Sequence, residues 1–184
     1  MIRLSPLNQR RWRNFRANRR AFWSLIIFGL LYFVSLFAEF IANDRPILVN
    51  YRGAYFYPTF NFYPETTFGG EFRTRAVYRA DEVRCLIHTG GAELCLDYPE
   101  DAMAEALAQG TVEGEPIVRG WMLWPPIPYS YNTVNDLGGP APSPPDSRHL
   151  LGTDDTARDV LARVIYGFRL SVTFALVVVA VSSL

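Results

Sequence analysis

The polar residues of this chain that could form a catalytic or metal-binding group lie between His149 and Arg169. Three acids, Asp154, Asp155 and Asp159, alternate there with Arg158 and Arg163, and such a set could form an acid–base or metal cluster. Helix capping and pairing with the arginines explain the acids more simply, because negative charge favours the start of a helix. We therefore predict a structural role for this segment, with no catalytic, metal-binding or cofactor-binding residue.

The two cysteines form a second candidate group. If residues 83–88 and 92–96 are two strands of a hairpin centred on Gly90, Cys85 lies directly opposite Cys95, which suits a disulfide. Free thiols remain the alternative. Zinc is not predicted, because the cysteines with His88 and the remote His149 do not give a recognised ligand spacing.

The element that positions the acids is predicted to be an amphipathic helix. Thr153 is a good N-cap residue, so the helix should start near Asp154 and run to Gly167. Residues 170–184 follow without a charge, and they are fewer than the roughly 20 that a span requires. We expect them to be the first part of a second transmembrane helix, cut short by the end of the chain.

These residues carry a family resemblance. The string LGTD at Leu151–Asp154, then RD at residues 158–159, then YG-x-R-x-S from Tyr166, resembles the permease subunits of oligopeptide, dipeptide and nickel ABC importers. The string NRRAFWSL at residues 18–25 is similar to the same family. Ala157 stands where that family usually has glycine, and this departure, with a long insert after the first span, most resembles the Yej-type branch linked to microcin C and peptide uptake.

The resemblance implies a non-catalytic permease that moves peptides or peptide-like compounds inward. It also implies the partners: a second permease, two cytoplasmic ATPases that bind ATP and magnesium, and a periplasmic solute-binding protein. The segment 149–169 would be a periplasmic-side elbow helix. The residues that the family motif places there, several of them polar fasteners, are Leu151, Gly152, Thr153, Asp154, Arg158, Asp159, Gly167 and Arg169.

The charge distribution sets the membrane topology. All 18 basic residues are arginine, and residues 1–20 hold seven of them with no acid. Residues 21–41 form an apolar run of about 31 Å in helical length, enough to cross a bilayer. The positive-inside rule then places residues 1–20 in the cytoplasm as a basic segment. Ser5 followed by Pro6 is a helix-start signature and predicts a short basic helix on the membrane face, with a solvated basic tail as the alternative. We expect a bacterial inner-membrane protein, multi-pass in its full-length form.

Residues 42–148, here called the insert, would lie in the periplasm. The insert holds 12 of the 13 prolines and a charge balance of 14 acids against 8 arginines. A short helix over Ala102–Gln109, with Gly110 as its stop, and short strands elsewhere predict an α+β domain. The proline-rich segments 121–128 and 138–145 should run extended over a surface.

Seven aromatic residues fall between Tyr51 and Tyr63. They could stack on a peptide or on the binding protein, or they could pack the core of the insert or sit at the membrane interface. The residues proposed for contact with substrate or binding protein are Tyr55, Tyr57, Phe60, Phe62, Trp121 and Trp124. Their role is left open between these alternatives.

Three other interpretations of the sequence are possible. A membrane-anchored extracytoplasmic binding or sensor domain would have the same composition and topology, and only the motif separates it from a permease. A cleaved twin-arginine signal is disfavoured, because the apolar run is longer than the 7–15 residues of a signal core. Nucleic-acid binding is not predicted, because the arginines lie directly before an apolar run and not on a folded domain.

Overall fold

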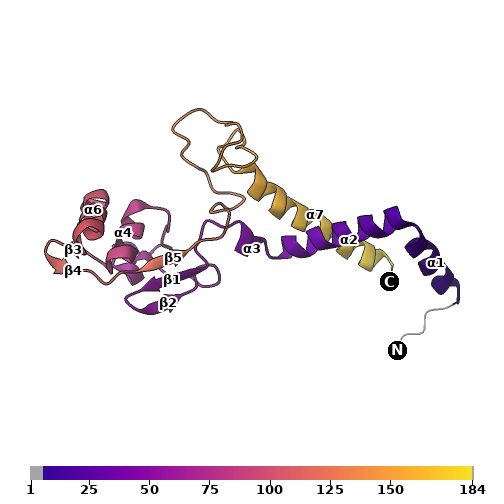
Figure 1. The fold of residues 1–184 in the computed structure, drawn as a ribbon, viewed down its shortest axis with the longest axis horizontal. Helices are drawn as coiled ribbons and strands as arrows, with labels where there is room; N and C mark the ends of the chain where they lie inside the picture. Colours follow the sequence, from indigo (N-terminus) through magenta and orange to yellow (C-terminus); the bar gives the residue numbers. More distant parts are fainter. Residues whose placement is uncertain (1–5, 184) are drawn as a thin grey trace. The chain divides into compact units, whose positions relative to one another are not determined.

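The computed structural model describes residues 6–183. Two compact units are formed (Figure 1). The first joins the two ends of the chain, up to Ala38 and from Ile165 onward, and the second comprises Glu39–Val164. The second unit contains the whole segment predicted as the insert, residues 42–148, together with three residues before it and sixteen after it.

The first unit is helical. Helix α1 (Pro6–Ala17) is the short basic helix expected at the start of the chain, and Pro6 occupies its first turn, where proline is tolerated. The proposed helix-start role of Ser5 lies outside the described residues. Asn18 is extended and separates α1 from α2 (Arg19–Leu36), and its side chain accepts a hydrogen bond from the amide of Ala21 at 3.3 Å.

Helix α2 and helix α7 (Val160–Ser182) are long and apolar enough to cross a membrane, by length and composition. They contain 18 and 23 residues, with mean hydropathies of 1.4 and 2.2. Within the first unit they meet at the ring pair Phe28–Phe168 and at a 3.0 Å hydrogen bond between Tyr32 and Thr173. The predicted span 21–41 is interrupted, because α2 ends at Leu36 and a separate turn of helix, α3 (Ala38–Ile41), follows.

The second unit contains a three-stranded antiparallel sheet in the order β2-β1-β5. Strand β1 (Leu48–Tyr51) and strand β2 (Ala54–Phe56) are joined by Arg52 and Gly53, both with positive φ, as a tight hairpin turn requires. Strand β5 (Trp121–Leu123) pairs with the other edge of β1. The segment 121–128 is therefore extended at its start, as predicted, but as a strand of the sheet.

Phe68 is the centre of one core cluster. It ends the short 3₁₀ helix η1 (Glu65–Phe68), it is fully buried, and its ring lies 5.4–6.5 Å from four other aromatic rings. These four belong to Tyr51, Phe56, Tyr63 and Tyr78. Edge-to-face geometry of this kind adds to the stabilisation that burial of each ring gives.

The predicted hairpin around Gly90 is wrong. Residues 83–88 lie in helix α4 (Asp81–Thr89), and residues 94–97 form the short helix α5 (Leu94–Asp97). Val83, Leu86 and Ile87 are buried at a helical spacing, two acids occupy the first turn, and Gly90 ends α4 with a φ of +80°. The spacing of the buried residues, the acids of the first turn and the final glycine therefore all favour a helix over a strand in this segment.

Helix α6 (Pro99–Gln109) includes the predicted helix and ends, as predicted, at Gly110. A two-stranded ribbon follows, made of β3 (Thr111–Val112) and β4 (Glu115–Pro116). The second core cluster lies beneath these elements and includes Leu86, Ala102 and Ala106. The second unit therefore contains both helices and strands, arranged around two small cores.

Candidate functional site: the loop that starts helix α7

The predicted helix start at Asp154 is wrong, because α7 begins at Val160. The preceding residues 143–159, here called the capping loop, form tight turns instead. The amide of Asp154 donates to the carbonyl of Arg158 at 2.9 Å, and the amide of Ala157 donates to the carbonyl of Asp154 at 3.0 Å. No separate elbow helix precedes the apolar segment, since α7 continues without a break from Val160 to Ser182.

Asp154 holds the turn of the capping loop closed. One carboxylate oxygen accepts hydrogen bonds from the amide and hydroxyl of Thr156 and from the amide of Arg158, at 2.8–2.9 Å, and the other pairs with Arg163. Burial opposes ionisation of this carboxyl, but these hydrogen bonds outweigh it and lower the pKa of Asp154 to about 2. Asp154 is therefore an anchor of the loop and not the cap of a helix.

Asp159 is the residue that caps α7. One carboxylate oxygen accepts a hydrogen bond from the amide of Ala162 at 2.8 Å, three residues into the helix. The other oxygen lies 2.8 Å from Nδ1 of His149, and both side chains are buried. The imidazole in turn packs against the ring of Tyr129 at 4.5 Å between centroids. This buried pair joins the beginning of the capping loop to the first turn of α7.

Gly152 and Thr153 bring the capping loop close to its own start. Gly152 has a φ of +73°, and a Cβ there would lie 2.4 Å from the carbonyl oxygen of Ser143. The amide of Thr153 donates to that same carbonyl at 3.1 Å, and the amide of Ser143 donates to Oγ1 of Thr153 at 3.0 Å. The LGTD string therefore needs glycine for both backbone conformation and space.

Ala157 adopts a φ of +58°, in the left-handed region that favours glycine. This conformation gives a physical reason for the glycine that is usual in the family. The carbonyl of Ala157 accepts two hydrogen bonds from Asn135, one from its amide at 3.0 Å and one from its side chain at 3.1 Å. The turn thus ties the capping loop to the segment around Asn135.

The remaining motif residues differ in their surroundings. Leu151 and Gly167 are exposed, and a Cβ at Gly167 would meet nothing within 4 Å. The guanidinium of Arg169 lies 4.8 Å from the ring of Tyr166. The backbone of Arg158 takes part in the loop, whereas its buried Nε has no hydrogen-bond partner among the described residues.

Sequence reasoning missed His149 and Asn135. It treated His149 only as a remote and incomplete metal ligand, and it did not consider Asn135. Asp159 could have been predicted as the N-cap of a helix, because aspartate is a preferred residue at that position. The contact between His149 and Asp159 depends on how the loop folds back, and nothing in the local sequence encodes it.

The aromatic candidates divide into buried and exposed groups. Of the seven rings between residues 51 and 63, Tyr51, Phe56 and Tyr63 belong to or pack against the core around Phe68. Trp124, also a candidate, packs against the same core. The candidates that are exposed are Tyr55, Tyr57, Phe60, Phe62 and Trp121.

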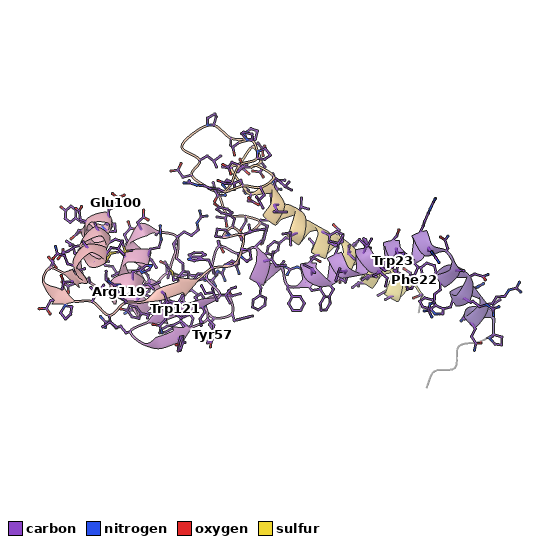
Figure 2. The ribbon with its side chains drawn as sticks, viewed as in Figure 1. Phe22, Trp23, Tyr57, Glu100, Arg119 and Trp121 are labelled. Atoms are coloured by element: carbon purple, nitrogen blue, oxygen red, sulfur yellow. A yellow bond between two sulfur atoms is a disulfide. The ribbon has the colours of Figure 1, made fainter. Side chains whose placement is uncertain are left out.

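The exposed rings lie on the sheet and on the loop that follows it. Tyr55 and Trp121, from strands on opposite edges of β1, have ring centroids 6.3 Å apart. Phe60 lies 5.5 Å from Phe40. Figure 2 labels Tyr57 and Trp121 in the sheet region of the second unit. These rings are available for stacking on a partner, and their role as such stays a prediction.

Cys85 and Cys95 are bonded to each other, from α4 to the start of α5, with their Cα atoms 5.5 Å apart. Both residues are fully buried within the second core cluster. The hydroxyl of Thr89 lies 3.4 Å from Sγ of Cys95 and also donates to the carbonyl of Cys85. Among residues 6–183 there is no group of three histidine, cysteine or acidic side chains that could hold a metal ion.

Comparison with known proteins defines the class. Residues 5–64 match a family described as the N-terminal TM domain of oligopeptide transport permease C. Together with the two apolar helices, this match makes the chain similar to the membrane part of an oligopeptide transport permease. No solved structure matches the chain.

Two relatives match almost the whole chain. The inner membrane ABC transporter permease protein YejE of Escherichia coli K12 is 39% identical over 184 residues, which cover 100% of this chain and 46% of the relative. The peptidoglycan transport system permease protein YejE of Agrobacterium fabrum C58 is 38% identical over 205 residues, covering 98% of this chain and 46% of the relative. The chain belongs to the Yej-type ABC permeases, and it spans about half the length of these relatives. The predicted family is thereby confirmed.

Proposed function

We propose that this chain is part of a permease subunit of an ABC importer that carries peptides or peptide-like compounds across the bacterial inner membrane. The observation that carries the proposal is the 39% identity over all 184 residues to an inner membrane ABC transporter permease. A second permease, two ATPases and a periplasmic solute-binding protein complete the assembly, and ATP is hydrolysed on the ATPases. The capping loop fixes the start of α7, a helix long enough to span the membrane.

The topology proposed is a cytoplasmic N-terminus and a periplasmic insert. The seven arginines of residues 1–20 precede α2, which supports this orientation through the positive-inside rule. The bonded, buried cysteines also suit an oxidising compartment. A reporter that is active only in the periplasm, fused after residue 130, should be active, and the same reporter fused after residue 17 should not. The reverse pattern would overturn the orientation.

The substrate proposed is a peptide or a peptide-like compound, with microcin C and peptidoglycan fragments as specific candidates. The name of the Agrobacterium relative, a peptidoglycan transport system permease, supports the last of these. The exposed rings Tyr55, Phe60 and Trp121 would contact the substrate or the binding protein, because flat aromatic surface is well suited to stacking on peptide groups.

The test of the assembly is purification of the full-length protein in mild detergent. Mass spectrometry should find a second permease and two ATPases with it, and the ATPase activity of the complex should rise when a solute-binding protein and a peptide are added. Recovery of the protein without an ATPase would contradict the proposal.

The test of the aromatic surface compares two variants of the full-length protein in the same assay. Trp121→Ala should weaken the stimulation of ATPase activity by the binding protein. Tyr98→Ala should not, because Tyr98 is equally an exposed ring but lies at the start of α6 and not in the sheet. Equal behaviour of the two variants would assign the rings to packing or to the membrane interface.

A further inference from the structure

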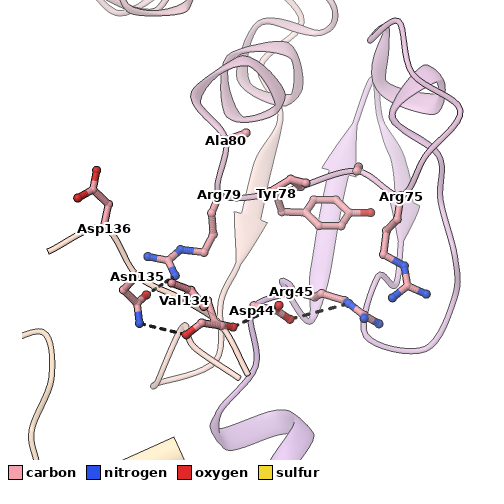
Figure 3. A pocket seen from close by; sticks show the side chains of 12 residues that line it. Asp44, Arg45, Arg75, Tyr78, Arg79, Ala80, Val134, Asn135 and Asp136 are labelled. Carbon is pink, nitrogen blue, oxygen red and sulfur yellow. Dashed lines mark hydrogen bonds and ion pairs between the residues drawn. The ribbon is translucent and has the colours of Figure 1, made fainter. Parts of the chain in front are cut away.

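The second unit contains a cavity of about 470 Å³ that the family resemblance did not predict (Figure 3). Its walls come from the chain just after α3, from the segment before α4 and from residues 133–136. Its charged side chains are Arg45, Arg75, Arg79, Asp44 and Asp136, and its hydroxyl groups belong to Tyr78 and Thr133. Cavities of this size hold small molecules.

Tyr78 supplies an unused donor in the cavity wall. The residue is 2% exposed, its ring packs against Phe68, and its hydroxyl has no hydrogen-bond partner among the described residues. A buried hydroxyl without a partner is unfavourable, so a hydrogen-bond acceptor that reached it would be stabilising. Figure 3 shows this hydroxyl directed toward the side of the cavity where Arg75 lies.

The charge environment keeps that hydroxyl a donor. Burial raises the pKa of Tyr78 far above its ordinary value, the nearby Tyr63 raises it further, and Arg45 and Arg75 act in the opposite direction. The phenol therefore stays protonated at neutral pH. The two guanidinium groups are close enough to influence it.

The guanidinium groups of Arg75 and Arg45 form no close ion pair within the described residues. Within residues 6–183, Arg75 has no carboxylate partner and lies over the ring of Phe62 at 5.3 Å. Arg45 reaches Asp44 at 3.9 Å only, the outer limit of an ion pair. Arg79, by contrast, donates to Asn135 at 2.9 Å and covers the ring of Tyr129. The available donors are thus Arg45, Arg75 and Tyr78.

We propose that this cavity binds a small solute through its carboxylate, with Arg45, Arg75 and Tyr78 as the hydrogen-bond donors. Guanidinium groups match the planar geometry of a carboxylate. Three arginines and two aspartates line the cavity, which leaves a single positive charge that suits a monoanion and disfavours a phosphate dianion. The proposal concerns the second unit alone and does not rest on the transport function.

The experiment uses the full chain in detergent and measures binding of N-acetyl-dialanine by calorimetry. Its C-terminal amide is the matched control for the carboxylate, and inorganic phosphate tests the charge argument. We expect the acid to bind at least tenfold more tightly than either. Equal binding of acid and amide, or tighter binding of phosphate, would overturn the proposal.

Two variants separate binding from folding. Arg75→Gln should weaken binding of the acid about tenfold, whereas Arg73→Gln, exposed on the same segment and absent from the cavity wall, should leave it unchanged. Tyr78→Phe should weaken binding as well, yet raise the midpoint of thermal unfolding of the unliganded chain, because it removes the unpaired hydroxyl. Unchanged binding in Arg75→Gln and Tyr78→Phe, or equal losses in Arg73→Gln, would refute the site.

Discussion

Helices α2 and α7 are both long and apolar, but they begin in different ways. The start of α2 is local: Asn18 alone supplies a cap, through one hydrogen bond of 3.3 Å to a residue three positions on. The start of α7 depends on a tertiary contact, since Asp159 caps the helix while its second oxygen contacts His149, ten residues earlier in the capping loop. The first arrangement can be found from a few neighbouring residues, and the second requires a folded loop.

This difference predicts unequal sensitivity to substitution. The largest effect is expected for Asp159→Ala, which removes the cap of α7 and leaves buried His149 without its partner. The free energy of opening the first turn should fall by about 3 kcal/mol. Hydrogen exchange at the amides of Ala162 and Arg163, in the full chain in detergent, measures it.

The matched control for that substitution is Asp155→Ala, an exposed acid of the same loop, which should change this free energy by less than about 0.5 kcal/mol. If exchange in the Asp159 variant matches that in the control, the tertiary cap has no energetic role.

Gly152→Ala should follow in size. The new Cβ would meet the carbonyl of Ser143 and the backbone would remain at positive φ, so we expect a loss of about 2 kcal/mol. Thermal unfolding followed by circular dichroism measures it. Gly167→Ala, where a Cβ would meet no atom within 4 Å, should instead stabilise α7 by about 0.5 kcal/mol. A loss of stability in this variant would contradict the open space described around Gly167.

Acid should weaken the capping loop through Asp154. Its pKa is about 2 in the folded chain, below the ordinary 3.8, so the ionised carboxylate stabilises the fold above about pH 4, and this contribution is lost as the pH falls toward 2. The unfolding midpoint of Asp154→Asn should change less with pH across this window than that of the unchanged chain. An equal change in both would exclude Asp154 as the source.

Ala157→Gly should stabilise the capping loop that starts α7, because it relieves an unfavourable backbone conformation. Glycine adopts the observed φ of +58° without strain, although it also makes the unfolded chain more flexible, and the net gain should be about 0.5 to 1 kcal/mol in thermal unfolding. Ala104→Gly, on the exposed side of α6, should destabilise by a similar amount. A loss in both variants would mean that the backbone at Ala157 is not strained.

The smallest effect is expected at the local start. Asn18→Ala should lower the free energy of opening the first turn of α2 by about 0.5 kcal/mol, measured by hydrogen exchange at Ala21. Asn14→Ala, inside α1, serves as the control and should leave Ala21 unchanged. A loss at Asn18 as large as that at Asp159 would remove the contrast between the two helices.

The sequence predicted those elements whose signals are local. The basic helix from Pro6, the two apolar helices and the stop of α6 at Gly110 all follow from caps, composition and spacing. The failure at residues 83–88 came from weighing the cysteine pair and the turn glycines above the helical spacing of Val83, Leu86 and Ile87. The spacing of these apolar residues was the better guide to the structure than a possible pairing of the cysteines across a hairpin.

The candidate site was predicted only in part. The family motif selects the segment that contains the capping loop. Thr153 and Asp154, each a good capping residue, predict a helix start there, whereas α7 begins at Val160. The glycine usual at the position of Ala157 was the one sign that the backbone turns there. The contacts of His149 and Asn135 join segments distant in sequence, and no local pattern specifies them.

The ring cluster around Phe68 gives the second unit a spectroscopic signature of its own. Five aromatic rings are held there in fixed orientations beside aliphatic side chains such as Val49 and Ile87. Rings fixed in an asymmetric surrounding produce near-ultraviolet circular dichroism, and their magnetic fields displace the methyl resonances of their neighbours. Loss of these signals would report melting of this unit even while the apolar helices keep the far-ultraviolet spectrum helical.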